Sequence, residues 1–224
     1  MQQDRRIRII TGSYGAGKTE FAVNYALKLA ASGVKTALVD LDVINLYFRS
    51  REKQEALEEA GVRVISSSIP GIGADMPAIS AEVAAPLQDK SWQVILDVGG
   101  DAAGARTLVR YETYFQPGAY DLFFVVNANR PDTATGASAL EHLEAIQKVA
   151  GIQATALVNN THMVRQTTME DVLRGQSLCA DIKKQAGLPI RYISLMKHLV
   201  PELPPQLEGE PFPLTLMMRE SWMS

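Results

Sequence analysis

A run of eight residues near the N-terminus has the composition of a loop that binds phosphate. The run is Gly12-Ser13-Tyr14-Gly15-Ala16-Gly17-Lys18-Thr19, and it matches the pattern G-x-x-x-x-G-K-[ST]. Glycine has no Cβ, so the backbone can wrap closely around an anion with its N–H groups pointing inward. Lys18 can then contact the β- and γ-phosphates, and the Thr19 hydroxyl can bind Mg²⁺. A plain glycine-rich turn would explain the glycines but not Lys18 and Thr19.

Two acidic segments follow short apolar runs and could complete a magnesium site. Asp97 ends the run Val94–Leu96, and P-loop proteins hold Mg²⁺ with a carboxylate in this position. Asp40 and Asp42 follow a second run, and they share a side if the strand persists. One of the two could hold a water of Mg²⁺ while the other orients the attacking water. A strand-ending turn with solvated aspartates is the alternative interpretation of both segments.

Two further segments predict contacts with the rest of a nucleotide. Gly99 and Gly100 would let a backbone N–H approach the γ-phosphate, so residues 97–101 could distinguish ATP from ADP. Asn159 and Asn160 follow a late apolar run, and an amide can both donate to and accept from the edge of adenine. The guanine motif N-K-x-D is absent there, so the sequence favours adenine. A turn-forming asparagine pair is the alternative.

The predicted site therefore has three sets of residues. The catalytic set is Lys18, Asp40 and Asp42, and the metal set is Thr19, Asp97 and Asp40. The nucleotide set is Gly12, Ser13, Tyr14, Gly15, Ala16, Gly17, Lys18, Thr19, Glu20, Gly99, Gly100, Asn159 and Asn160. Arg106, Arg110 and Arg130 could approach phosphate, although solvated arginines are the simpler interpretation. His142, His162 and His198 are too scattered for a metal site, and His142 suits surface or packing.

Alternation of short apolar runs with longer amphipathic segments predicts an α/β fold. Strands are expected at Ile7–Thr11, Thr36–Asp40, Val62–Ser66, Gln93–Val98, Asp121–Asn127, Ala154–Asn159 and Ile190–Ile193. Helices are expected at Lys18–Ser32, Phe48–Ala60, Ser80–Gln88, Ala102–Phe115, Ala134–Ala150 and Met169–Ala186. Nearly continuous apolar strands are typical of a parallel sheet covered on both faces. We expect the three-layer αβα fold of P-loop NTPases, with a mostly parallel sheet of about seven strands.

Composition limits the other classes of function. The 224 residues suit one nucleotide-binding domain over residues 1–200, followed by a proline-rich arm over 201–224 that packs on the domain or docks a partner. A net charge of −3 gives no basic footprint for nucleic acid. The single Cys179 excludes a disulfide framework. The N-terminus is not a signal peptide and no apolar stretch would span a bilayer, so we expect a cytoplasmic protein.

The motifs together resemble the SIMIBI class of P-loop NTPases, in particular its ParA/MinD/cobyrinic-acid-synthase members, over Ile7 to about Ile193. In that class Asp40-Leu41-Asp42 would be the first switch, 97–100 the second, and Asn159 the adenine contact. The resemblance implies an ATP-dependent switch that acts on a protein partner, often as a nucleotide-sandwich dimer. Many ParA/MinD proteins have a lysine where this chain has Ser13, so the sandwich would lack that contact.

Three classes of function follow from this site. The first is a regulatory ATPase with slow basal hydrolysis that a partner accelerates. The second is a small-molecule kinase or ATP-dependent synthetase, in which Ser66–Ile79 could form the acceptor pocket. The third is a module that binds ATP or ADP without hydrolysis. For the choice of base, the alternative to an ATP-binding protein is a GTP-binding protein.

Overall fold

A computed structural model of the chain describes residues 1, 3–42, 54–66 and 78–218. Eight strands form one sheet in the order β3-β2-β4-β1-β5-β6-β7-β8, and every neighbouring pair is parallel. The strands are β1 (Ile7–Thr11), β2 (Thr36–Asp40), β3 (Val62–Ser66), β4 (Gln93–Asp97), β5 (Tyr120–Val126), β6 (Ala156–Asn159), β7 (Ile190–Met196) and β8 (Glu210–Leu214). The seven expected strands are all present, with ends that differ by a few residues.

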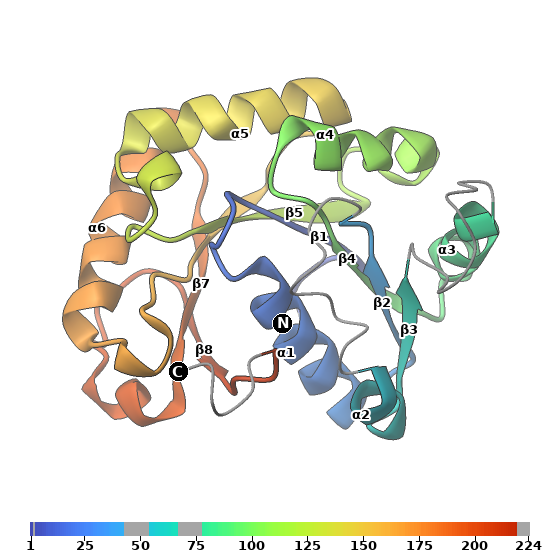
Figure 1. Cartoon of the computed structure of the whole chain (residues 1–224), viewed down its shortest axis with the longest axis horizontal. Helices are drawn as coiled ribbons and strands as arrows, with labels where there is room; N and C mark the ends of the chain where they lie inside the picture. Colours follow the sequence, from blue (N-terminus) through green and yellow to red (C-terminus); the bar gives the residue numbers. More distant parts are fainter. Residues whose placement is uncertain (2, 43–53, 67–77, 219–224) are drawn as a thin grey trace.

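Helices cover both faces of this sheet, which gives three layers (Figure 1). One face is covered by α1 (Lys18–Ala31) and α2 (Gln54–Glu59). The other face is covered by α3 (Ala78–Gln88), α4 (Ala102–Ala105), the 3₁₀ segment η2 (Arg106–Tyr114), α5 (Gly136–Ala150) and α6 (Met169–Ala186). Three short 3₁₀ segments complete the described elements, namely η3 (Pro131–Thr133), η4 (Val164–Gln166) and η5 (Lys197–Glu202).

Successive residues of the central strands enter opposite cores. Ile9 packs with the layer of α5, whereas the next residue, Ile10, packs with the layer of α1, and both are fully buried. This follows from the two-residue period of a strand. A strand buried on both faces therefore needs apolar residues throughout, and the continuous runs in the sequence reflect this requirement.

The strand order reverses at β1, and this places the functional loops. The first connections lead to β2, β3 and β4 on one side of β1, and the later ones lead to β5 through β8 on the other. Ligands of open α/β sheets bind at such a switch point, outside the carboxyl ends of the strands. The loop between β1 and α1 lies at this point.

The N-terminus of α1 lacks the side-chain cap that α5 and α6 have. Thr135 and Thr168 cap α5 and α6 with capping boxes, and Gly151 and Gly187 end them in the left-handed conformation. By contrast, the N-cap residue of α1 is Gly17, which has a φ of 83° and provides no side-chain cap. The first-turn N–H groups of α1 are therefore suited to bind an anion instead.

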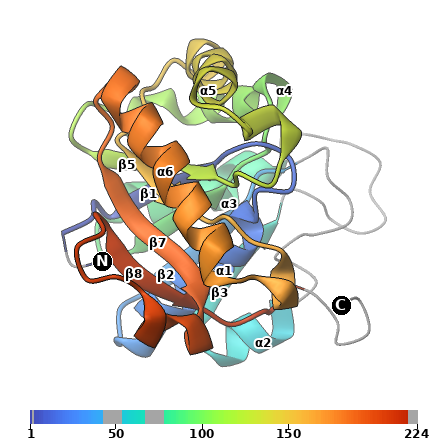
Figure 2. The same ribbon diagram turned by 90° about the vertical axis from the view of Figure 1, so that its left-hand side faces the viewer.

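The C-terminal region contains a strand that was not predicted from the sequence. Residues 201–224 were expected to form an extended arm, yet Glu210–Leu214 pairs with β7 as the edge strand β8 (Figure 2). The strand contains Pro211 and Pro213, which normally argue against a strand. An edge strand tolerates proline because one side of it needs no hydrogen bonds.

Two other expectations are changed or lie partly outside the described residues. The expected helix Ala102–Phe115 is divided, since α4 ends at Ala105 and η2 continues as a 3₁₀ segment. The expected helix Phe48–Ala60 is described only from Gln54, and most of Ser66–Ile79 lies outside the described residues. In the part of the chain that the structure describes, no helix is long and apolar enough to cross a membrane.

Candidate functional site

The predicted phosphate loop connects β1 to α1 and packs tightly against β5. Gly12 has a φ of 150°, and a Cβ at this residue would lie 2.2 Å from the carbonyl oxygen of Val125. Gly17 has a φ of 83°, and a Cβ there would lie 2.4 Å from the side-chain nitrogen of Asn160. Both positions therefore require glycine, for the backbone conformation and for the close approach of neighbouring groups.

Side chains from the ends of β5 and β6 hold the loop by its carbonyl groups. Arg130 Nε donates to Gly15 O at 2.9 Å, and Asn127 Nδ2 reaches the same oxygen at 3.5 Å. Asn160 Nδ2 donates to Ala16 O at 2.7 Å. In a trans peptide the N–H points opposite to the C=O, so the N–H of Gly17 faces the inside of the loop. The loop thus has the orientation that phosphate binding requires.

Lys18 lies inside the site with its charge directed at the loop. Lys18 is 8% exposed, and its Nζ donates to Ser13 O at 3.1 Å. Burial lowers the pKa of Lys18, while the nearby Asp97, Asp42 and Asp101 act in the opposite direction. The ammonium group is therefore poorly solvated, and an anion that replaces water beside it would be bound strongly.

The second acidic segment lies directly against this lysine. A Cβ on Gly100 would lie 2.7 Å from Lys18 Nζ and 2.5 Å from Gly12 O. The segment that follows β4 is thus adjacent to the phosphate loop, as expected for Gly99 and Gly100. Glycine is required at position 100 because any side chain would collide with loop backbone.

Asp97 is a buried carboxyl group at the carboxyl end of β4. It is 1% exposed and pairs in register with Asp40 on β2. Burial, followed by the charge of Asp40, raises the pKa of Asp97 to about 7, against the opposing effects of Thr19 and Lys18. Neither oxygen of Asp97 makes a hydrogen bond of standard geometry with the described residues. A buried carboxylate of this kind is energetically costly unless a cation or a bound water satisfies it.

This donor set fits Mg²⁺ bound together with a nucleotide. Within the described residues no group of three or more His, Cys, Asp and Glu side chains could hold a metal by itself. Mg²⁺ in nucleotide sites does not need one, because phosphates and waters supply most of its ligands. The neighbouring Thr19 hydroxyl and Asp97 carboxylate would supply the protein's share.

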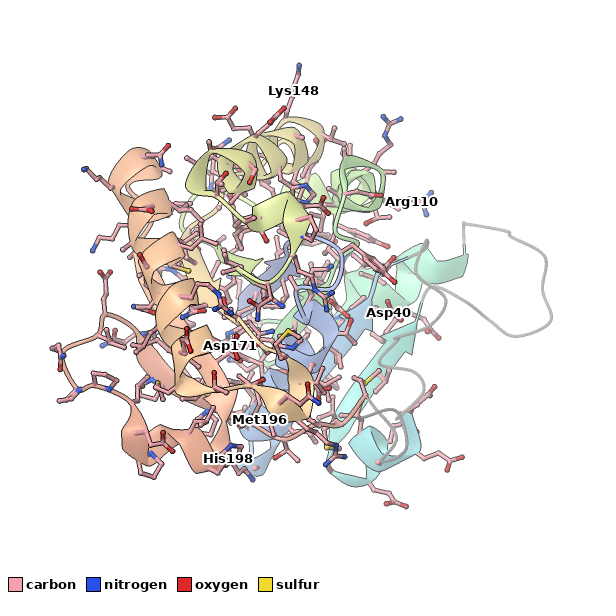
Figure 3. The ribbon with its side chains drawn as sticks, turned by 60° about the vertical axis from the view of Figure 1, so that its left-hand side comes forward. Asp40, Arg110, Lys148, Asp171, Met196 and His198 are labelled. Carbon is pink, nitrogen blue, oxygen red and sulfur yellow. The ribbon has the colours of Figure 1, made fainter. Side chains whose placement is uncertain are left out.

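Asp40 and Asp42 do not have equivalent positions. Asp40 is the last residue of β2 (Figure 3) and is 1% exposed. Its Oδ1 accepts a hydrogen bond from the N–H of Asp42 at 3.1 Å. The strand ends there, so the alternation that would give the two a common side does not continue. Asp42 lines the cavity in front of the loop, and Asp40 does not. Asp42 is therefore the better candidate to orient water.

A cavity of about 260 Å³ continues from the phosphate loop toward the C-terminal edge of the sheet. Its polar end is formed by the phosphate loop, and its other end is largely apolar. The apolar end is lined by Val164, Leu195, Met196, Leu214, Leu216 and Met218. Two buried polar atoms on its wall, Asn160 Oδ1 and Ser194 Oγ, have no hydrogen-bond partner among the described residues. A planar base with polar edges would satisfy such a wall.

The structure changes the assignment of the two asparagines. Asn159 was expected to contact the base, yet its Nδ2 donates to Val172 O and Gln176 Oε1, and its Oδ1 accepts from the N–H of Thr161. These bonds direct Asn159 into the packing against α6, and it does not line the cavity. Asn160 is the asparagine that faces the cavity.

Glu20 also differs from its expected role. Its carboxylate accepts hydrogen bonds from the N–H groups of Met217, at 2.6 Å, and Met218, at 3.2 Å. The neighbouring Asn24 binds both the N–H and the C=O of Thr215, each at 2.8 Å. Helix α1 therefore holds residues 215–218, which contribute to the apolar wall of the cavity. Glu20 positions this wall, although it also lines the cavity.

Several site residues were not predicted, or were predicted only weakly. His162 lines the cavity, and its Nδ1 accepts from the N–H of Val164 at 3.2 Å. Of the three arginines considered, Arg130 reaches the loop, whereas Arg106 and Arg110 are exposed. Asn127 directly follows β5, as Asn160 directly follows β6, so a polar residue after an apolar strand was the available signal.

Comparisons with known proteins identify the fold. No protein-family model matches the chain, and no curated protein sequence does. FtsY from Mycoplasma mycoides is similar in structure, with a TM-score of 0.56 and 15% identity over 85% of this chain and 61% of that chain. The cell division protein FtsY from Thermotoga maritima has a TM-score of 0.53 and 20% identity, over 83% of this chain and 60% of that chain.

A third match is the signal recognition particle receptor FtsY from Elizabethkingia anophelis in complex with GDP. Its TM-score is 0.52 and its identity 20%, over 86% of this chain and 58% of that chain. The chain thus spans about three fifths of the length of these proteins. At such identity the likeness concerns the fold alone, which is an α/β fold of the P-loop NTPase type with a parallel sheet. The finer resemblance to ParA and MinD stays a prediction.

Proposed function

We propose that this protein binds a nucleoside triphosphate with Mg²⁺ and hydrolyses it slowly, as a switch that acts on a protein partner. The observation that carries the proposal is the convergence of two buried side chains and one backbone segment. These are the ammonium of Lys18, the carboxyl of Asp97 and the backbone of Gly100, which meet at the open end of a phosphate loop. A loop with only a structural role would not need a buried lysine near a buried carboxyl group.

Each residue has a distinct part in the proposed reaction. The loop N–H groups and Lys18 would bind the β- and γ-phosphates and stabilise the charge that develops on their oxygens. Thr19 and Asp97 would hold Mg²⁺, which neutralises phosphate charge when bound. Asp42 would orient the attacking water, because it lines the cavity in front of the loop. Asp40 would support it through the hydrogen bond to its N–H.

We propose ATP as the nucleotide, on the evidence of the cavity wall. Asn160 lines the cavity, and because its Nδ2 donates to Ala16 O, its Oδ1 is the acceptor that is left without a hydrogen-bond partner among the described residues. An acceptor matches the amino group of adenine, whereas guanine presents an oxygen at the same position. GTP is the alternative, since one FtsY of this fold is known in complex with GDP.

The proposal includes a protein partner and a location in the cell. A switch requires a protein partner, and a second copy of this chain is one candidate. Ser13 is fully buried beside Thr133, so residue 13 offers no charge to a nucleotide on another subunit. We place the protein in the cytoplasm, where ATP is abundant.

Thermal unfolding with ATP, GTP or ADP, each with Mg²⁺, tests the proposal directly. A ligand that binds the native state raises the melting temperature by mass action. We expect the largest rise with ATP, and we expect Lys18→Ala to abolish it while the unliganded variant still unfolds cooperatively. The matched control is Lys184→Ala, which removes an exposed lysine of α6.

Phosphate release by the wild-type protein separates the classes of function. Slow release without any acceptor is expected for a switch, and a kinase or synthetase would instead require its acceptor. Equal stabilisation of wild type and Lys18→Ala by ATP would reject the site. A larger rise with GTP would reject the assignment of the base.

A further inference from the structure

His142 makes a hydrogen bond that links α5 to the segment after β4. Its Nε2 lies 2.6 Å from the carbonyl oxygen of Gly100. A carbonyl oxygen can only accept, so Nε2 carries the proton and donates it. The imidazole is half-buried and lies beside the ring of Phe124, with 6.3 Å between the centroids. From the sequence, a surface or packing role was expected for His142, whereas its ring makes a hydrogen bond to a backbone group of the site.

Gly100 is in contact with the phosphate loop on its other side. A Cβ on Gly100 would lie within 2.5 Å of Gly12 O and within 2.7 Å of Lys18 Nζ. This residue therefore lies between α5 and the catalytic lysine. Any displacement of Gly100 toward or away from α5 changes the space in front of Lys18 Nζ.

The segment is fixed at both ends, whereas its two glycines have no side chain to hold them. Asp97 ends β4, and Asp101 caps α4 by accepting from the N–H of Gly104 at 2.7 Å. Gly99 and Gly100 carry no side chain and can change conformation easily. The bond from His142 fixes the peptide that joins Gly100 to Asp101, and the N–H of that peptide points away from α5.

We propose that His142 is a positioning residue that holds the Gly100 peptide in front of Lys18 and thereby sets the preference for triphosphate over diphosphate. Lysine at this place of a phosphate loop reaches the β- and γ-phosphates, so the peptide beside Nζ lies at the γ-phosphate end. A diphosphate would not extend to this peptide. The inference rests on the proposed function and assigns a residue that no motif of the phosphate loop contains.

Three variants test this inference. His142→Phe keeps a ring beside Phe124 and removes the donor, while His142→Gln keeps a donor. Glu141→Gln changes an exposed neighbour on the same helix and is the control. Dissociation constants are measured by calorimetry, with Mg²⁺, for ADP and for an ATP analogue whose β–γ bridge is an imido group.

We expect His142→Phe to weaken binding of the triphosphate analogue about 3- to 10-fold, which is the usual effect of one lost hydrogen bond. Binding of ADP should stay within about twofold of wild type, because the β-phosphate is held by the loop. His142→Gln should restore most of the preference, and Glu141→Gln should not change it. Equal weakening of both nucleotides by His142→Phe, or of neither, would overturn the inference while leaving the proposed function intact.

A second measurement uses the wild-type protein and does not depend on the folding of a variant. In ¹⁵N-labelled protein, the Nε2 resonance of His142 should shift more on addition of the triphosphate analogue than on addition of ADP. Equal shifts would overturn the inference. Absence of binding by either nucleotide would overturn both the inference and the proposed function, so the two failures are distinguishable.

Discussion

Asp97 shows how the environment of one residue can control binding. Its carboxyl group is fully buried next to Asp40, so the charged form is disfavoured and the pKa rises to about 7. In the absence of nucleotide this group is therefore partly protonated near neutral pH. Mg²⁺ requires the carboxylate, and binding of the cation must displace the proton.

We predict that the affinity for Mg²⁺ with nucleotide rises with pH between about 6 and 8, measured by magnesium titration at fixed nucleotide concentration. The folded pKa lies above the unfolded one, so the folded state binds more protons between about pH 4 and 7. The unliganded protein should consequently lose stability as pH rises through this range. Asp97→Asn should remove both effects, and a variant that keeps the pH dependence would exclude Asp97 as its source.

Asn159 and Asn160 can be compared directly for their effects on base preference and on stability. Asn159 makes hydrogen bonds to α6 and to Thr161, whereas Asn160 lines the cavity and its Oδ1 has no hydrogen-bond partner among the described residues. We predict that Asn160→Ala reduces the ratio of ATP to GTP affinity about 3- to 10-fold, as expected for one lost hydrogen bond. Asn159→Ala should destabilise the fold by about 1–3 kcal/mol and leave that ratio unchanged.

Competition binding and urea unfolding of the two variants provide the measurements. The reverse result, in which Asn159→Ala alone alters base preference, would restore the assignment that was made from the sequence. An unchanged ratio in both variants would place base recognition elsewhere, and Ser194 would be the next candidate because its buried Oγ lies on the same wall.

At the scale of elements, α1 connects the phosphate loop to the C-terminal segment. The helix begins at the loop, and nearly two turns later Asn24 holds Thr215 through both of its backbone groups. Residues 215–218 follow β8 and supply part of the apolar cavity wall. The phosphate end and the base end of the cavity thus depend on different parts of one helix.

We predict that Asn24→Ala weakens ATP binding about fivefold and lowers the free energy of unfolding by about 1–3 kcal/mol, because Thr215 loses buried partners. Binding of tripolyphosphate should not change, since that ligand uses the loop alone. Asn24→Ala leaves the charge of the site unaltered, so electrostatic changes do not complicate the comparison. Equal weakening of both ligands, measured by calorimetry, would show that the segment acts on the loop rather than on the base.

At the scale of the whole molecule, β8 and the segment after it are part of the core. Phe212 is 2% exposed, and its ring centroid lies 4.7 Å from that of Phe21 and 5.3 Å from that of Tyr192. Lys28 donates to Pro213 O and lies over the Phe212 ring, at 3.5 Å from its centroid. The strand therefore completes the layer on the α1 side of the sheet.

We predict that Phe212→Ala lowers the free energy of unfolding by about 3–5 kcal/mol, as expected when a large buried side chain is removed. Phe212→Leu is the matched control and should cost substantially less, because most of the buried volume is retained. Urea unfolding measures both. A loss below about 1 kcal/mol for Phe212→Ala would mean that β8 is peripheral to the stability of the domain.

The amino-acid sequence by itself determined the phosphate loop, the α/β alternation and the positions of Asp97 and Gly100 after apolar strands. These features depend on local rules, namely glycine conformation, strand and helix periods, and the fixed place of a strand's carboxyl end. Local rules act within a few residues, so they are visible without knowledge of the packing. The strands β1 to β7 were predicted for the same reason.

Only the tertiary structure decided which neighbouring side chain faces the site. The choice between Asn159 and Asn160 depends on the competing partners that α6 supplies, and the position of Glu20 depends on a segment almost 200 residues away. β8 was missed because its prolines contradict strand propensity, and pairing with β7 at a sheet edge removes the penalty. The bond from His142 to Gly100 joins residues 42 positions apart, so no local pattern could reveal it.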